Sequence, residues 1–251
     1  MKVLAIGNSF SEDGTRYLHQ VAKAAGVDMK VVNLCIGGCP LRLHFANAMG
    51  DYRNYGMQLN GMFSGFKVSI KEALLSDEWD VVTIQQVSYL SVNYDTFQPY
   101  LNFMVEYIRT HAPKAKLYLQ ETWAYEKGSK RLCEELKYEK PEDMLRDIRS
   151  SYQKAAEAIG ADGIIPSGEV MYEMIKQGIE KVHRDTFHAK FGIGRYALGL
   201  TWYATLTGND VLDNSFTELV EPATEKEMQI ARECVHDIIF GTDKQMEVLY
   251  E

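Results

Sequence analysis

The chain has 251 residues, a formal net charge of −8, a sequence pI near 5.4 and 46% hydrophobic residues. The acidic balance argues against nucleic acid or an anionic membrane surface as the main partner, while the hydrophobic content is sufficient for a sizeable core. No apolar run approaches the roughly 18 residues of a membrane span. Four cysteines are too few for a disulfide scaffold, and Cys35 and Cys39 lack the His or Cys pair that would complete a zinc site. We therefore expect free thiols and no bound metal.

The N-terminus carries a single lysine and a short apolar run, without a signal-type segment and cleavage site. We expect a cytoplasmic protein, or a periplasmic or secreted one if a leader has been removed from the chain. There is no repeat, low-complexity tract or linker, so the sequence predicts a single domain over residues 1–251.

Short apolar runs alternate along the chain with longer segments of helical period, which predicts βα units and a parallel sheet. The expected strands are Val3–Ile6, Lys30–Leu34, Val81–Ile84, Leu117–Leu119 and Gly163–Ile165. The expected helices are Thr15–Ala25, Phe97–Ile108, Pro141–Ile159, Glu169–Val182, Ile193–Leu206 and Thr224–Ile239.

We expect an α/β fold: a three-layer α/β/α sandwich around a mostly parallel sheet of about five strands, of the flavodoxin-like type. Residues 36–66 have many Gly, Asn and aromatic residues and no clean period, which predicts a long irregular segment. In such a sheet ligands bind at the carboxyl ends of the strands, so the polar residues that follow each strand are the candidates for function.

The first of these loops, "GNSFS", begins where the first strand ends. It lacks the glycine spacings of phosphate-binding loops and runs into Glu12 and Asp13, which disfavours a phosphate site. Ser9 stands where a nucleophile could, near a helix N-terminus. Taken alone, Ser9 and Ser11 are better explained as turn or cap hydroxyls than as nucleophiles. Glu12 and Asp13 suit the first turn of the helix.

A second stretch, "VHRDTFH", places Asp185 three residues before His188. A catalytic histidine needs an acid on its second ring nitrogen, and this spacing can supply both groups from one loop. His183 is nearby but has no acid at the matching offset. An isolated D-x-x-H is also typical of surface polar residues or a helix cap.

The combination is more specific: a G-x-S turn after the first strand, a glycine pair after the second, polar side chains after the third, and D-x-x-H near the C-terminus. This order resembles the GDSL/SGNH hydrolase superfamily over essentially the whole chain, and within it bacterial members related to carbohydrate O-acetyl esterases.

The resemblance implies a Ser-His-Asp triad of Ser9, His188 and Asp185, working through an acyl-enzyme without a cofactor or metal. Asn8 stands where the family usually has Asp. The backbone N–H groups of Ser9 and Gly38 would stabilise the oxyanion. The usual Asn of the third block is missing from "IQQVS", and the related esterases imply Gln85 as the side-chain donor, with Gln86 as the alternative.

The expected substrate is a small O-acyl ester, by preference an O-acetyl group on a carbohydrate. Aromatic residues in the strand-end loops, among them Tyr89, Trp123 and Tyr125, suit sugar binding and equally suit ordinary loop packing. The alternative function is a non-catalytic, flavodoxin-like module that binds a nucleotide or another small molecule.

Overall fold

The computed structural model describes residues 1–241, in which seven strands form one sheet of order β4-β3-β2-β1-β5-β6-β7. All neighbouring pairs are parallel except β2–β3 and β3–β4, which are antiparallel. The strands are β1 (Lys2–Gly7), β2 (Lys30–Cys35), β3 (Tyr55–Leu59), β4 (Met62–Val68), β5 (Val81–Ile84), β6 (Lys116–Gln120) and β7 (Gly163–Ile165).

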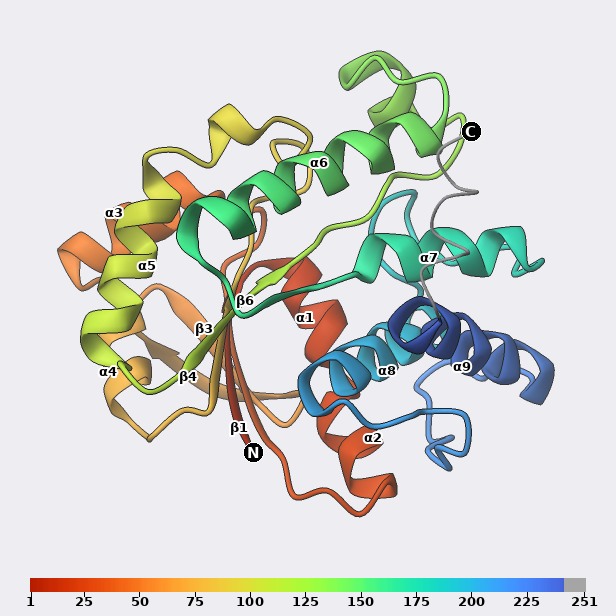
Figure 1. Ribbon diagram of the computed structural model, residues 1–251, viewed down its shortest axis with the longest axis horizontal. Coiled ribbons are helices and arrows are strands. Elements are labelled where there is room, and N and C mark those ends of the chain that lie inside the picture. Colours follow the sequence, from red (N-terminus) through yellow and green to blue (C-terminus); the bar gives the residue numbers. More distant parts are fainter. Residues whose placement is uncertain (242–251) are drawn as a thin grey trace.

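Helices cover both faces of this sheet (Figure 1). On one side lie α3 (Leu41–Gly50), α4 (Ile70–Leu75), α5 (Tyr100–His111) and α6 (Pro141–Ile159). On the other side lie α1 (Ser9–Thr15), α2 (Leu18–Ala24), α7 (Ser167–Lys176), α8 (Ile193–Thr207) and α9 (Glu225–Phe240). Two short helical turns, η1 (Tyr94–Thr96) and η2 (Arg131–Glu135), interrupt the connections after β5 and β6. The expected three-layer α/β/α architecture is confirmed.

Local chemistry accounts for several helix boundaries. Pro141 opens α6, where its missing N–H costs no hydrogen bond, and Gly160 ends that helix in the left-handed conformation with φ 57°. Thr224 caps α9 with a capping box, in which Glu227 reaches back to the Thr224 backbone N–H. The five strands expected from the sequence all form, with shifts of at most one residue at their ends.

The expectation of an irregular segment over residues 36–66 is wrong. Most of it forms α3 and the antiparallel hairpin of β3 and β4, which extends the sheet from the expected five strands to seven within the described residues. The edge strand β4 has no buried residue, so no alternation of apolar and polar positions marks it in the sequence. The short helix α4, with its Ser69–Glu72 capping box, is a second element that hydrophobic period did not predict.

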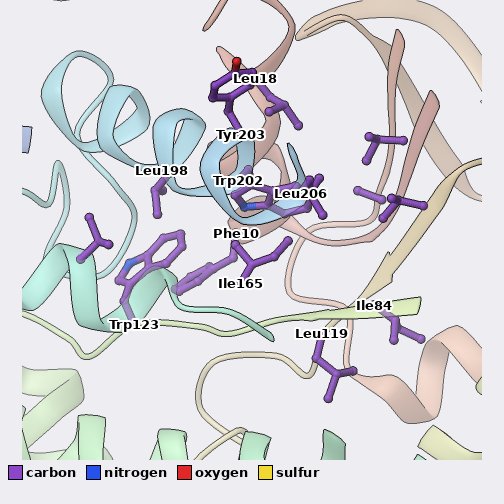
Figure 2. Close-up of a cluster of buried hydrophobic side chains, with 14 of the residues drawn as sticks. Phe10, Leu18, Ile84, Leu119, Trp123, Ile165, Leu198, Trp202, Tyr203 and Leu206 are labelled. Atoms are coloured by element: carbon purple, nitrogen blue, oxygen red, sulfur yellow. The ribbon is translucent and has the colours of Figure 1, made fainter. Parts of the chain in front are cut away.

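Buried core residues surround the start of α1. β1 is buried on both faces, with Val3, Leu4, Ala5 and Ile6 all fully inaccessible. Phe10, in the first turn of α1, stacks on Trp123 with ring centroids 4.0 Å apart. Figure 2 shows this pair beside Ile165, with Trp202 of α8 above them in the view. The first helix is therefore anchored by aromatic packing right next to the strand end that precedes it.

None of the helices within residues 1–241 is both long and apolar enough to cross a membrane.

Two glycines at the contact of α8 with α1 and α2 provide a test of this packing. A Cβ at Gly14 would lie 2.6 Å from Trp202 Nε1, whereas one at Gly199 would meet nothing nearer than 3.4 Å. We expect Gly14→Ala to lower the free energy of unfolding by about 1–3 kcal/mol through overpacking. The control Gly199→Ala should be neutral or gain up to about 1 kcal/mol of helix propensity. Urea denaturation measures both, and equal stabilities of the two variants would contradict the packing described.

Candidate functional site

Ser9 lies at the junction of the central strand β1 and helix α1. β1 ends at Gly7, Asn8 is the N-cap residue, and Ser9 is the first residue of the helix. The Asn8 side-chain oxygen accepts a hydrogen bond from Phe10 N at 2.9 Å, which fixes the helix start. A one-residue link between a buried strand and a capped helix leaves Ser9 little freedom of position.

Ser9, His188 and Asp185 form a continuous hydrogen-bonded chain. Ser9 Oγ lies 2.8 Å from His188 Nε2, and His188 Nδ1 lies 2.8 Å from Asp185 Oδ2. The sequence separates Ser9 from His188 by 179 residues. The fold therefore brings together the three residues predicted as a triad, in the order nucleophile, base and orienting acid.

The loop that carries the acid and the base has a special backbone. Thr186, between Asp185 and His188, has φ 77°, which is strained for a β-branched residue. The turn lets Asp185 bind His188 twice, because its other oxygen accepts the His188 backbone N–H at 2.9 Å. Partial burial alone would raise the pKa of Asp185, but the hydrogen bonds from the His188 ring and backbone outweigh it and hold that pKa below its usual range. Asp185 is thus kept ionised, as an orienting acid must be.

The competing histidine is a structural residue. His183 is buried, its Nε2 lies 3.0 Å from Ala124 O, and burial lowers its pKa to about 4.

The backbone N–H groups of Ser9 and Gly38, the predicted oxyanion donors, have no hydrogen-bond partner among the described residues. The first is an orphan donor of the helix N-terminus, because the Asn8 cap takes the next N–H. The second sits in the turn closed by Cys39 N donating to Ile36 O at 3.2 Å. Gly38 has φ 63° and open space where a Cβ would be, so backbone conformation and not room is what favours glycine there.

The Asn8 amide joins these two loops. Its Nδ2 donates to Cys39 O at 3.1 Å, and its Oδ1 accepts from Gln85 Nε2 at 2.9 Å besides Phe10 N. One buried side chain therefore connects the ends of β1, β2 and β5. An aspartate could accept two of these bonds but could not donate to the Cys39 carbonyl.

Both glutamine amides are bonded to other groups, so neither the predicted donor Gln85 nor the alternative Gln86 presents a free side-chain N–H to an oxyanion in this arrangement. Gln85 Nε2 donates to Asn8 Oδ1 and, at 3.4 Å, to Gln86 O. Gln86 donates to Thr96 O and accepts from Leu41 N, so it ties the loops after β2 and β5 together. Both side chains are buried and support the turns behind the site.

Two of the three expected substrate-binding aromatics are also placed differently. Trp123 and Tyr125 are 0% and 1% exposed, so neither presents a surface to a substrate. Trp123 Nε1 donates to Phe187 O at 2.7 Å, and the Tyr125 ring packs edge-on against Phe187. Both residues support the loop of the base. Tyr89 is 45% exposed and stays a prediction as a substrate contact.

Residues to which the sequence analysis gave no role in the site complete the surroundings of Ser9, Asp185 and His188. Asp13, expected to be a first-turn residue of the helix, is fully buried and accepts a hydrogen bond from Ala189 N at 3.0 Å. Arg184, next to Asp185, contacts both Asp13 oxygens. Arg131 lies over the Phe187 ring at 4.0 Å. The one feature of the sequence that could have pointed to Asp13 is its spacing of one helical turn from Ser9.

No group of three or more His, Cys, Asp or Glu side chains within residues 1–241 is arranged to hold a metal ion. The functional groups of the site are the Ser9 hydroxyl, the His188 imidazole, the Asp185 carboxylate and backbone N–H donors.

Solved structures share this fold. A DUF4886 family protein from Bacteroides uniformis is 31% identical, with a TM-score of 0.88 over 97% of this chain and 96% of that one. A putative SGNH hydrolase from Slackia heliotrinireducens is 19% identical, with a TM-score of 0.60 over 82% of this chain and 98% of that one. An acetyl xylan esterase from Geobacillus stearothermophilus is 14% identical, with a TM-score of 0.52 over 82% of this chain and 94% of that one. The expected likeness to the SGNH hydrolase fold is confirmed.

A search of curated proteins finds none that matches the chain. The family model described as "Domain of unknown function (DUF4886)" matches residues 2–238, and the chain belongs to this family.

Proposed function

We propose that the protein is a serine ester hydrolase with Ser9 as nucleophile, His188 as general base and Asp185 as orienting acid. One observation carries the proposal: the unbroken chain from Ser9 Oγ to His188 Nε2 and from His188 Nδ1 to Asp185 Oδ2, with 2.8 Å at each step. A serine used only as a turn or cap hydroxyl has no need of a histidine that is itself held by a carboxylate.

In the first step Ser9 Oγ attacks the ester carbonyl while His188 Nε2 takes its proton. Asp185 holds the neutral imidazole in the tautomer with the proton on Nδ1 and stabilises the imidazolium that forms. The tetrahedral intermediate then collapses, the C–O bond to the alcohol breaks, and His188 returns the proton to the leaving alkoxide. In the second step water attacks the acyl-enzyme with His188 again as base, which releases the acid and regenerates Ser9.

The developing oxyanion would be stabilised by the N–H groups of Ser9 and Gly38. Both are free of partners among the described residues, and the Ser9 N–H also benefits from the positive end of the α1 dipole. Because Gln85 and Gln86 are engaged elsewhere, the proposed hole has two backbone donors and no side-chain amide.

For the substrate we propose a small O-acyl ester, with an O-acetyl group on a carbohydrate as the first class to test. Support comes from the SGNH-type fold and from the likeness, in fold, to an acetyl xylan esterase. The exposed Tyr89 is the remaining candidate for stacking on a sugar ring. The alternative of a flavodoxin-like binding module leaves the triad geometry without a role.

The proposal is tested by Ser9→Ala in a p-nitrophenyl acetate assay. Removal of the nucleophile should lower kcat/KM by at least about 10³-fold, with the free energy of unfolding nearly unchanged. Ser11→Ala is the matched control, since Ser11 Oγ is buried and bonds Asn8 O and Asn33 Oδ1 instead of His188. It should keep most of the activity. Full activity of Ser9→Ala would exclude Ser9 as the nucleophile.

The role of Asn8 is tested by Asn8→Asp. The new carboxylate would face the Cys39 carbonyl oxygen, to which the Asn8 amide donates in the wild type. Two acceptors would then repel each other, and we expect the Gly38 turn to shift. We expect kcat to fall by about tenfold or more, because full removal of an oxyanion donor costs about 10²–10³.

Asn33→Asp serves as the control for burying a carboxylate, because Asn33 is equally buried and donates to Gln58 Oε1 on β3, while the bond that its Oδ1 accepts from Ser11 Oγ is one a carboxylate can keep. This variant should lose stability and keep its kcat. A kcat of Asn8→Asp equal to that of the wild type would show that the Asn8–Cys39 bond does not position the oxyanion donors.

A further inference from the structure

Asp13 is a fully buried carboxylate in a helix that also carries the proposed nucleophile. It lies four residues after Ser9 on α1, and therefore one turn along the same face. Its Oδ2 accepts the Ala189 N–H at 3.0 Å, and Ala189 follows His188 directly in the chain. A single rigid helix thus holds Ser9 and, through Asp13, the backbone next to the base.

Two arginines enclose the carboxylate. Arg184 Nη1 lies 3.0 Å from each Asp13 oxygen and also donates to Ala189 O, while Arg195 Nε donates to Asp13 Oδ1 at 2.7 Å. Both guanidiniums lie over the ring of Phe191, at 4.5 and 4.6 Å from its centroid. Burial raises the pKa of Asp13, and the two guanidinium groups oppose that effect.

The arrangement spans the loop of the triad at both ends. Arg184 precedes Asp185, and Ala189 follows His188. Arg184 N donates to His188 O at 3.0 Å, so the loop is closed on itself and anchored to α1 as one unit. The strained Thr186 lies inside this closed segment. A strained turn persists only where surrounding contacts hold it in place. The contacts of Asp13 are some of those that hold this turn.

We propose that Asp13, held between Arg184 and Arg195, is a positioning residue that sets the distance between Ser9 and His188. The inference rests on the proposed function and deepens it. Asp13 touches none of the reacting atoms; it acts through the Ala189 N–H and Arg184. Because proton transfer depends on hydrogen-bond distance, displacement of the loop by about 1 Å can cost about 10²-fold in rate.

The test is Asp13→Asn in the purified 251-residue chain with p-nitrophenyl acetate as substrate. The asparagine amide has nearly the volume of the carboxylate. However, its NH₂ group would face N–H donors that in the wild type bond to an oxygen of Asp13. We expect kcat to fall by about 10- to 100-fold with KM little changed, at a temperature where urea denaturation shows the variant folded. A purely structural role would lower stability and leave the kcat of the folded protein intact.

Glu12→Gln is the matched control, since it removes the same charge from the same helical turn. Glu12 reaches only Arg195 Nη2 of this cluster, at 3.4 Å, and makes no bond to the loop. It should keep its kcat. If Asp13→Asn does not fold, Arg184→Met replaces it, because the Arg184 side chain is 20% exposed and its loss leaves Asp13 paired with Arg195. That variant should also lose kcat with KM little changed.

The outcomes are separable. Suppose that the wild type is active and that the kcat of Asp13→Asn, or of Arg184→Met in its place, lies within about twofold of the wild-type kcat. This result would overturn the positioning role and leave the proposed function standing. A wild type that hydrolyses no ester, or one whose ester hydrolysis is unchanged by Ser9→Ala, would overturn both.

Discussion

The buried amide of Asn8 is the interaction on which the candidate site depends. It caps α1 through Phe10 N, receives Gln85 from the end of β5 and donates to Cys39 O after β2. Adjacent parallel strands end at one edge of the sheet, but their loops are separate segments that could each move. Because the Asn8 side chain both donates and accepts hydrogen bonds, it fixes the positions of three of these loops relative to one another. The Ser9 and Gly38 N–H groups lie on two of these loops, so their mutual position follows from Asn8.

The second constraint is the shortness and rigidity of α1. The helix carries Ser9 in its first turn, Phe10 in the aromatic core against Trp123, and Asp13 in contact with the distant loop of the base. Burial of Phe10 fixes the helix on the sheet, and Asp13 fixes the base loop on the helix. Ser9 and His188, the proposed nucleophile and base, are 179 residues apart in the chain and are thereby held by the same helix.

The sequence predicted the layers and the five strands β1, β2, β5, β6 and β7, because buried parallel strands leave continuous apolar runs. Short motifs also marked Ser9 and His188, which the fold brings within 2.8 Å of each other. The sequence analysis missed β4, where both faces are exposed and no period exists. It also misplaced the glutamines and Trp123, since residue type does not tell which way a side chain points at a strand end. The buried Asp13 looked like an ordinary first-turn carboxylate, and only the tertiary contact with Ala189 distinguishes it.

A fluorophosphonate adduct mapped by mass spectrometry tests the central claim most directly, since such a reagent reacts with a serine that is activated as a nucleophile. The account predicts a single covalent adduct on Ser9, which disappears in Ser9→Ala and is strongly slowed in His188→Ala. An adduct on Ser11 or another serine, or no adduct at all in the folded protein, would contradict it.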